Sequence, residues 1–509
     1  MLVVYHANQQ VLRVLLDKQP LDVFNPKDPI CVVLTKLAQQ YPNELLVWCH
    51  ENVAHAIQLE AIPSLVTLAH EIISFQPGYG GYFGSTIEWV EESLFVAVPK
   101  HIRYATWMIS AQAGAMQARL WTQIAPSNTS DSFDYTLHSI GKRLQSSGVF
   151  CYSEPSLLNE KLNTTMASSS STCELYRFVK QHYKGIWVWI LFWQQVRHQQ
   201  KWACWALMIS LFIRRKTPLV LSIDLEPSIE PIASAVSVLI PTLNRPQYLA
   251  DFLADLQSQS LVPKQVIIIE QNPVPNSSSQ LTAVLYQQWN FQVIHLFTHQ
   301  LGVCHARNLG LAQVTGDWVF FADDDIRISP SFLEESLHKM KQNNAQAVSF
   351  ACISPQQTAI EKPIIQWNAF GGGSSLVAAK ALHNCTFSAV FEHGFGEDLD
   401  FGMQLRRSGT DVLFFNTPAI THLKAPSGGF RVKKTTLWEQ EVLMPKPAPT
   451  VMAYLQRYYT PNQLASYKLL LLLKFYGKQS VKNPLLYYRR FQQQWKQSVY
   501  WASKLEQQP

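Results

Sequence analysis

The chain has 509 residues, of which 47% are hydrophobic and 12% aromatic, so it can bury large cores and global disorder is excluded. This length predicts roughly two to four structural units. The net charge is only +6, but it is unevenly placed. From Arg431 to the end there are thirteen Lys and Arg against three acids, which leaves the rest of the chain slightly negative.

The eight cysteines are scattered, and none forms a CxxC pair or stands at zinc-binding spacing from histidine. Reduced thiols of this kind are typical of cytoplasmic proteins. The first residues, MLVVYHANQQ, lack a charged region followed by an apolar core, so we expect no signal peptide. These features predict a cytoplasmic location.

A second basic stretch, Glu174 to Lys216, contains eight Lys and Arg and one acid. Like the C-terminal tail, it is dense in aromatic and leucine side chains. This combination indicates binding either to nucleic acid or to an anionic membrane surface. Since no nucleic-acid motif accompanies it, we expect no nucleic acid partner and favour peripheral attachment at the inner face of the cell membrane. Ordinary buried helices are the alternative.

Two breaks in composition divide the chain. A Ser/Thr-rich run, Asn163–Thr172, is typical of a linker, and Glu226–Pro231 marks a second break. We therefore predict an N-terminal domain at 1–160, a linker and basic aromatic helical connector at 161–232, a catalytic domain at 233–435, and a basic helical tail at 436–509.

The third segment alternates buried strands with predicted helices over Tyr248–Ser258, Leu281–Trp289 and Cys304–Val314, which predicts an α/β domain with a doubly wound sheet. Ligands of such sheets bind beyond the carboxyl ends of the strands. The predicted strands are Ala235–Ile240, Gln265–Glu270, Gln292–Phe297 and Trp318–Ala322, and polar side chains follow three of them, in Pro241–Arg245, at Glu270 and in Asp323–Asp325.

Three consecutive carboxylates, Asp323–Asp325, end the strand Trp318–Ala322. Their mutual repulsion needs a positive partner. A divalent cation chelated together with a diphosphate is the natural one, because Mn²⁺ and Mg²⁺ prefer oxygen ligands. A solvated acidic turn is the bland alternative.

A second acidic segment, Gly396–Asp400, precedes a predicted helix over Phe401–Arg407. Acidic side chains stabilise helix N-termini, but three in four residues exceed what capping needs. Between the two acidic motifs lies the glycine loop Ala369–Ser375. Its glycines allow the backbone to approach a ligand closely, although a simple tight turn would also use them.

Four runs carry a family resemblance, in the order SVLIPTLNRPQYL, VIIIEQN, GVCHARNLGLAQVTGDWVFFADDDI and FGEDLDFGMQLRRSG. From about Ser237 to His422 the chain resembles family 2 glycosyltransferases with the GT-A fold, in particular their galactosyl- or galactofuranosyl-transferase-like branch. This implies an inverting, metal-dependent transfer of a sugar from a nucleotide-sugar to a hydroxyl of a glycan or glycolipid in cell-surface polysaccharide or lipopolysaccharide synthesis. A UDP-sugar is the commonest donor in this family, with GDP- and dTDP-sugars left open.

The resemblance also implies roles for individual residues. Asp398 would be the base that deprotonates the acceptor hydroxyl, Glu397 would orient the acceptor, and Asp400 would cap the helix. A manganese or magnesium ion would be held by Asp323, Asp325 and His422. The nucleotide-sugar would contact Pro241, Thr242, Asn244, Arg245, Glu270, Arg307, Asn308, Asp323 and Asp324.

The N-terminal segment contains a weaker copy of the sequence pattern seen in the third segment. Leu34–Val53 parallels Leu309–Ile326, with Cys49–Glu51 in place of the three aspartates, and Asp134 lies near the position of Asp398. We therefore predict a degenerate GT-A-like domain that lacks its nucleotide half and serves as a scaffold or binds the acceptor.

Two other functions compete with sugar transfer. A nucleotidyltransferase shares the sheet topology and the carboxylate-bound metal. It would need a glycine-rich phosphate loop after the first strand, however, and Pro241–Pro246 has no glycine. A catalytically inactive scaffold subunit is disfavoured for the third segment by its intact acidic motifs.

Overall fold

The computed structural model describes residues 1–22, 24–77, 81–126, 129–159, 169–221, 234–392, 394–426 and 436–507. The chain forms two compact units, one made of Met1–Asp224 and Tyr459–Leu471, the other of Leu225–Tyr458 and Leu472–Pro509. The helices predicted as a connector thus belong to the first unit, and the predicted tail is divided between both. Most of the predicted Ser/Thr linker lies outside the described residues.

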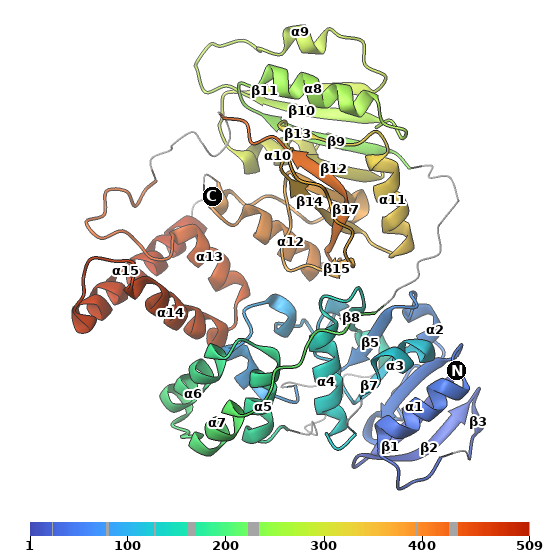
Figure 1. Ribbon diagram of the computed structural model, residues 1–509. Coiled ribbons are helices and arrows are strands. Elements are labelled where there is room, and N and C mark those ends of the chain that lie inside the picture. Colours follow the sequence, from blue (N-terminus) through green and yellow to red (C-terminus); the bar gives the residue numbers. More distant parts are fainter. Residues whose placement is uncertain are drawn as a thin grey trace. The chain divides into compact units, whose positions relative to one another are not determined.

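The second unit is built on one mixed sheet (Figure 1). Four parallel strands occupy one side, and the antiparallel β16 joins them to the remainder. This confirms the α/β prediction. In spatial order the strands are β11 (Gln292–Thr298), β10 (Gln265–Gln271), β9 (Val236–Thr242), β12 (Trp318–Ala322), β16 (Ser374–Ala378), β14 (Ala347–Ile353), β17 (Leu413–His422) and β13 (Ile326–Arg327), with β15 (Ile365–Gln366) paired to β17.

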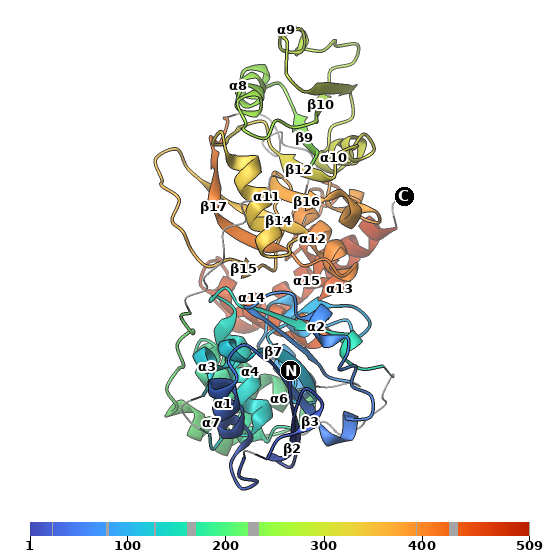
Figure 2. The same cartoon turned by 90° about the vertical axis from the view of Figure 1, so that its right-hand side faces the viewer.

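Helices cover both faces of this sheet because neighbouring strand residues point to opposite sides. Phe320 packs on Phe332 of α11 (Phe332–Gln342), whereas Phe321 packs on Phe401 of α12 (Glu397–Arg407). Helix α10 (Val303–Leu311) shares the face of α12. Figure 2 shows the helices on either side of the strands.

Two predicted helices differ in the structure. The helix expected over Leu281–Trp289 is reduced to α9 (Thr282–Leu285), whereas α8 (Pro246–Gln257) is close to expectation. Helix α12 begins at Glu397 rather than Phe401, so all three acids lie in its first turn. Its N-cap is Gly396 with φ 125°, a conformation that favours glycine.

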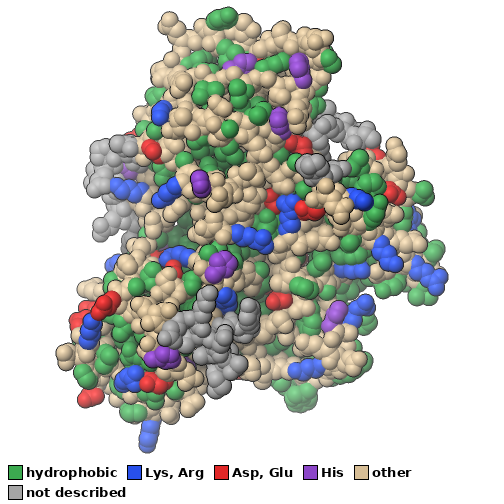
Figure 3. All heavy atoms as spheres, turned by 180° about the vertical axis from the view of Figure 1, so that it is seen from behind, with side chains coloured by type: hydrophobic (Ala, Val, Ile, Leu, Met, Phe, Trp, Pro, Cys, Tyr) green, Lys and Arg blue, Asp and Glu red, His purple; other side chains and the backbone are tan. Residues whose placement is uncertain are grey.

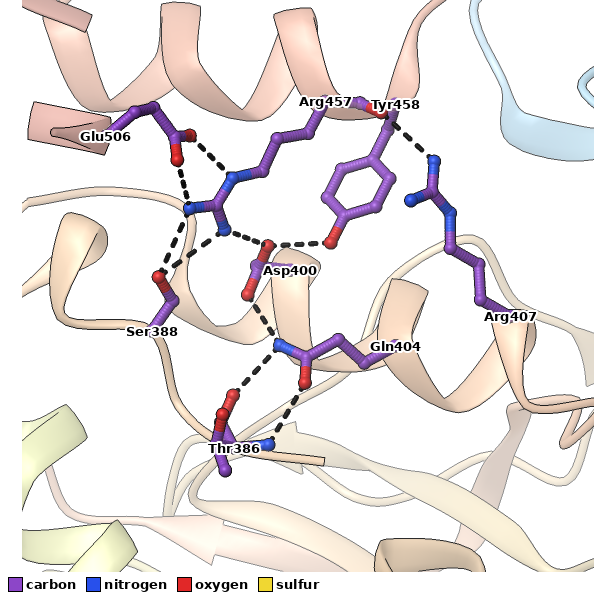
Figure 4. Close-up of polar contacts among 8 residues, drawn as sticks. All are labelled: Thr386, Ser388, Asp400, Gln404, Arg407, Arg457, Tyr458 and Glu506. Atoms are coloured by element: carbon purple, nitrogen blue, oxygen red, sulfur yellow. Dashed lines mark hydrogen bonds and ion pairs between the residues drawn. The ribbon is translucent and has the colours of Figure 1, made fainter. Parts of the chain in front are cut away.

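The expected capping role of Asp400 is wrong, since α12 has no side-chain cap and Asp400 makes long-range contacts instead. Asp400 is fully buried and accepts hydrogen bonds from Arg457 (2.8 Å) and Tyr458 (2.7 Å), both on α13 (Pro449–Tyr458). Arg457 also binds Glu506 at the end of α15 (Pro484–Glu506) (Figure 4). The C-terminal helices are therefore anchored on the helix that carries Glu397 and Asp398.

The first unit has its own sheet and a helical layer. Helices α5 (Thr172–His182), α6 (Ile186–Gln199) and α7 (Cys204–Leu211) share a core with the segment 82–107. No described helix of either unit is long and apolar enough to cross a membrane. The strands run in the order β3 (Gln19–Pro20), β2 (Gln10–Leu16), β1 (Leu2–Ala7), β4 (Leu45–His50), β7 (Ala113–Gln117), β5 (Glu71–Phe75), β8 (Phe150–Ser153) and β6 (Tyr104–Ala105).

Six strands of the first unit repeat the second unit's sheet in order and direction. The series β1-β4-β7-β5-β8-β6 has the same parallel and antiparallel pairings as β9-β12-β16-β14-β17-β15, and β6 lies between β5 and β7 in the chain as β15 lies between β14 and β16. Where the second unit adds the parallel β10 and β11, the first unit adds the antiparallel β2 and β3.

Single hydrogen bonds are repeated as well. The N–H of Ser110 donates to Oγ of Ser74 (3.1 Å), as that of Gly371 donates to Oγ of Ser349 (3.2 Å). The N–H of His50 donates to the carbonyl of Gln112 (2.7 Å), as that of Asp323 donates to the carbonyl of Gly373 (3.2 Å). His50 therefore occupies the position of Asp323.

The anchor at Asp400 gives a stability prediction. Replacing Asp400→Asn leaves the partly buried Arg457 with one charged partner fewer, which we expect to destabilise the second unit by about 3 kcal/mol. The control is Asp251→Asn, whose 3.7 Å ion pair with Arg327 is exposed and should change stability by less than about 1 kcal/mol. Calorimetry of the full chain measures both, and equal midpoints for the two variants would contradict the anchor.

Candidate functional site

Most of the predicted site residues converge at the carboxyl ends of β9 and β12. Asp323–Asp325 leave β12, Thr242 ends β9, and α12 brings Glu397 and Asp398. The loop 371–373 enters β16 beside them. Two acidic motifs more than 70 residues apart are thus joined by the topology of the sheet.

Asp323, Asp325 and His422 form a cluster that suits a divalent cation. Each offers one ligand atom, and these atoms lie within 4.8 Å of one another. His422 is the last residue of β17 and pairs with Ile326, directly after the three aspartates. Two carboxylates and an imidazole form a mixed oxygen and nitrogen donor set that suits a divalent cation, so the predicted metal ligands lie together.

The ionisation of this cluster follows from its contacts. Burial opposes the charge of Asp325, but hydrogen bonds from His422 and from the N–H of Ala425 outweigh it and lower the pKa of Asp325 to about 2. The same hydrogen bond raises the pKa of His422. Partial burial raises the pKa of Asp323, and Arg307 opposes this shift. A cation would displace the His422 proton and relieve the repulsion between Asp323 and Asp325.

Asp324 is not part of this cluster and supports the loop that follows β9. It accepts hydrogen bonds from Thr242 (2.6 Å) and Arg245 (2.6 Å). Burial raises the pKa of Asp324 to about 6 despite these donors. Asn244, which lies between Thr242 and Arg245 in the sequence, is exposed and has a left-handed backbone with φ 55°, a conformation that asparagine tolerates. The predicted nucleotide loop is therefore tied to the aspartate triad.

Arg307 connects the two acidic motifs. Its guanidinium lies 3.1 Å from Asp398 and 3.7 Å from Asp323, and it is 5.0 Å from the ring centre of Phe387. The side chain is 5% exposed, and its Nε has no partner among the described residues. Asp323 and Asp398 keep 41% and 32% exposure, so both stay open to a ligand.

The glycines of the loop 371–373 are required by close approach. A Cβ on Gly372 would lie 2.3 Å from Asp398 and 2.4 Å from Arg307. A Cβ on Gly373 would lie 2.2 Å from Cγ of Asp323. The loop backbone therefore packs directly on the charged cluster, which explains why this position needs glycine.

Glu397 lies beside Asp398 but is 8% exposed. Burial and the neighbouring Asp398 raise the pKa of Glu397 to about 7. Such a carboxyl group can donate or accept a hydrogen bond near neutral pH, which suits contact with a hydroxyl group.

Two predicted site residues are occupied by protein contacts. Glu270 accepts hydrogen bonds from Ser279 (2.5 Å), the N–H of Gln280 (2.8 Å) and His295 (2.9 Å). Asn308 pairs both side-chain atoms with the backbone of Phe387 at 2.8 Å. The structure does not bring either side chain into the acidic cluster.

One supporting residue was missed from the sequence. Glu392 accepts hydrogen bonds from the N–H groups of Cys304 (3.2 Å) and His305 (2.8 Å) at the start of α10, and so fixes the helix that carries Arg307. A carboxylate at a helix N-terminus is favourable, but 88 residues separate Glu392 from Cys304, so no local pattern indicates the pair.

The loop geometry predicts how a methyl group would act. Gly373→Ala should displace the Asp323 carboxylate and weaken Mn²⁺ binding by roughly tenfold or more, since one ligand is misplaced. The matched control is Gly477→Ala, because a Cβ there meets no atom within 4 Å. Calorimetric titration with Mn²⁺ measures both, and equal affinities for the two variants would refute the packing argument.

The sequence of residues 237–391 matches the family described as glycosyl transferase family 2. An uncharacterized glycosyltransferase of Bacillus subtilis, YwdF, is 30% identical over 120 residues, which is 23% of this chain and 43% of that protein. Glycosyltransferase GlyG of Streptococcus pneumoniae is 20% identical over 117 residues, which is 23% of this chain and 38% of that protein. The chain spans less than half the length of either relative.

Similar solved structures include S. aureus TarS 1–349 in complex with UDP-GlcNAc, at 16% identity and a TM-score of 0.37, covering 52% of this chain and 79% of that one. GalNAc-T7 with UDP, GalNAc and Mn²⁺ is 11% identical with a TM-score of 0.37, covering 46% and 50%. The family match confirms the resemblance seen in the sequence motifs, and the C-terminal half of this chain contains a family 2 glycosyltransferase domain.

Proposed function

We propose that the second unit is an inverting, metal-dependent glycosyltransferase that moves a sugar from a nucleotide-sugar to a hydroxyl group of a glycan or glycolipid. The observation that carries this is the position of Arg307. Its guanidinium contacts both Asp323, a member of the candidate metal cluster, and Asp398, the candidate base. Sugar transfer needs a site for the diphosphate and a base for the acceptor side by side, and this cluster offers both.

The residues divide the reaction between them. Asp323, Asp325 and His422 would hold a divalent cation, which supplies neutralisation of charge on the departing diphosphate. Asp398 accepts the proton of the acceptor hydroxyl as its oxygen bonds to the anomeric carbon and the bond to the diphosphate breaks. Attack from the face opposite the leaving group inverts the configuration. Glu397 orients the acceptor, and Arg307 keeps Asp398 in place.

The donor side is set by the loop after β9. Pro241, Thr242 and Arg245 lie next to the aspartate triad, and the exposed Asn244 is free to meet a ribose or base. A UDP-sugar is proposed from the family resemblance. The galactosyl or galactofuranosyl branch, and a role in cell-surface polysaccharide or lipopolysaccharide synthesis, rest on the same resemblance.

We also propose that the protein works at an anionic membrane surface on the cytoplasmic side. Large apolar side chains face solvent in α6, in α7 and in the residues that follow each helix. Among them are Trp202 (71% exposed), Trp205 (75%) and Phe212 (84%). No acid lies between Glu174 and Asp224, whereas eight Lys and Arg do. Exposed tryptophans among cations are typical of membrane-interface helices.

The C-terminal helices have a similar composition. Leu485 (74% exposed) and Leu486 (56%) precede Arg489 and Arg490 on α15. Figure 3 shows Lys and Arg side chains interleaved with hydrophobic ones over these helices, at its right-hand edge. Both predicted basic aromatic stretches therefore present apolar and cationic groups to solvent.

The catalytic roles predict the effect of two substitutions. With a panel of sugar nucleotides as donors, Asp398→Asn and Asp325→Ala should each lower nucleoside-diphosphate release by roughly a hundredfold or more, and chelation of divalent cations should abolish it. Asp251→Asn, an exposed acid of the same unit, is the control and should retain full activity.

Other outcomes would support the competing functions. Release of pyrophosphate from nucleoside triphosphate and sugar phosphate would identify a nucleotidyltransferase. No turnover by the wild type with any donor would favour an inactive scaffold. Unchanged release in both aspartate variants would show that the proposed mechanism is wrong.

Flotation with lipid vesicles tests the proposed membrane binding. Trp202→Ser, Trp205→Ser and Phe212→Ser combined should lower recovery with phosphatidylserine-containing vesicles to near background, because about 2 kcal/mol of apolar burial is lost per side chain. Val274→Ser, Tyr286→Ser and Ile360→Ser remove other apolar groups that are 59%, 84% and 67% exposed and form the control. Equal recovery of the two triple variants, or no recovery of the wild type, would refute the proposal.

A further inference from the structure

We propose that a second pocket, wholly within the first unit, binds the phosphate group of a small phosphorylated ligand. This goes beyond sugar transfer, because no residue of the acidic cluster takes part. The cavity measures about 380 Å³ and lies between α4 (Phe133–Leu144), α5 and residues 215–217. A volume in this range is typical of small-molecule sites.

Four cations line the pocket and face one acid. They are Arg143 of α4, Arg177 of α5, Arg215 and Lys216, and the acid is Asp131. Arg177 pairs with Asp131 at 2.8 Å. Within the described part of the chain, none of the other three cations has an ion-pair partner. The pocket therefore has an uncompensated positive charge.

The polar atoms of the lining are arranged to receive an anion. Nε of Arg177 is buried and has no hydrogen-bond partner among the described residues. Nε of Arg143 donates to the carbonyl of Thr217 (2.8 Å), and Nζ of Lys216 donates to Oγ of Ser139 (3.2 Å), which holds both side chains at the pocket. Thr136 and Gln181 add uncharged polar groups to the lining.

Burial and the positive charge of the pocket together lower the pKa values of two basic groups beside it, His182 and Lys216. Burial lowers the pKa of His182 to about 2, and Lys216, Lys142 and Arg143 lower it further. Burial also lowers the pKa of Lys216, with Arg143 and Arg177 acting in the same direction and Asp131 against them. A bound anion would relieve this repulsion among the cations.

A phosphate monoester fits this arrangement better than a carboxylate. It carries close to two negative charges and three acceptor oxygens, which suits several converging guanidinium and ammonium groups. The cavity also has room for more than a phosphate, so the ligand would carry a polar group such as a sugar or glycerol. Thr136, Ser139 and Gln181 supply hydrogen-bonding partners for its hydroxyl groups.

This chemistry has two possible sources, a soluble sugar phosphate or a lipid phosphate headgroup. Arg215 follows α7, the helix whose tryptophan and methionine side chains are exposed, by four residues. A lipid headgroup is therefore one natural source, and a soluble phosphorylated metabolite is the other.

The test uses the full chain and a double variant, Arg215→Gln with Lys216→Gln. Arg215 is exposed, and the Lys216 side chain makes one hydrogen bond, so the fold should be retained. Lys27→Gln with Arg119→Gln removes the same charge from exposed positions of the same unit and is the control. Calorimetric titration with glycerol 3-phosphate should show binding to the wild type and control, and roughly tenfold weaker binding or more to the pocket variant.

Vesicles of phosphatidylcholine, with phosphatidic acid or with phosphatidylglycerol added, separate the sources. Pocket-dependent recruitment to phosphatidic acid identifies a lipid headgroup, and pocket-dependent binding of glycerol 3-phosphate without such recruitment identifies a soluble ligand; both support the site. Equal weakening in the control and pocket variants, or no binding of either probe by the wild type, overturns it.

Discussion

The site depends on one buried cation, Arg307, placed between carboxylates from two distant segments. Without it, Asp323, Asp325, Glu397 and Asp398 would repel one another in a partly buried site, where water screens their charges less than at the surface. With it, Asp323 and Asp398 approach the same guanidinium from two sides while each remains partly exposed. The same residue thus stabilises the fold around the site and leaves its acids open to ligands.

Other contacts follow from this constraint. Because Arg307 must lie close under the loop 371–373, that loop has no room for side chains at Gly372 and Gly373. Glu392 fixes the helix of Arg307, and Arg457 fixes the helix of Asp398 through Asp400. The C-terminal helices therefore have a structural role at the site, in addition to the surface that they present to solvent.

The sequence predicts local features well and long-range pairs poorly. The strand Trp318–Ala322 was predicted residue for residue, because a buried run followed by three acids is a local signal. The metal-type cluster of Asp323, Asp325 and His422 was also assembled as expected. The partners of Asp400 were missed, since 57 residues separate it from Arg457 and no periodicity connects them. For the same reason the packing of α5–α7 within the first unit could not be predicted.

The first unit shows what remains of such a sheet when the cluster is absent. At the position of Asp323 stands His50, and the ring of His6 lies 5.2 Å from it and 5.3 Å from Phe133, which begins α4 as Glu397 begins α12. Burial lowers the pKa of His6 to about 4, so this ring stays neutral, and its Nε2 is hydrogen-bonded to the carbonyl oxygen of Ala111 (2.9 Å). The helix that brings Glu397 and Asp398 to the acidic cluster in the second unit thus has a counterpart in the first unit, α4, whose Arg143 lines the cationic pocket.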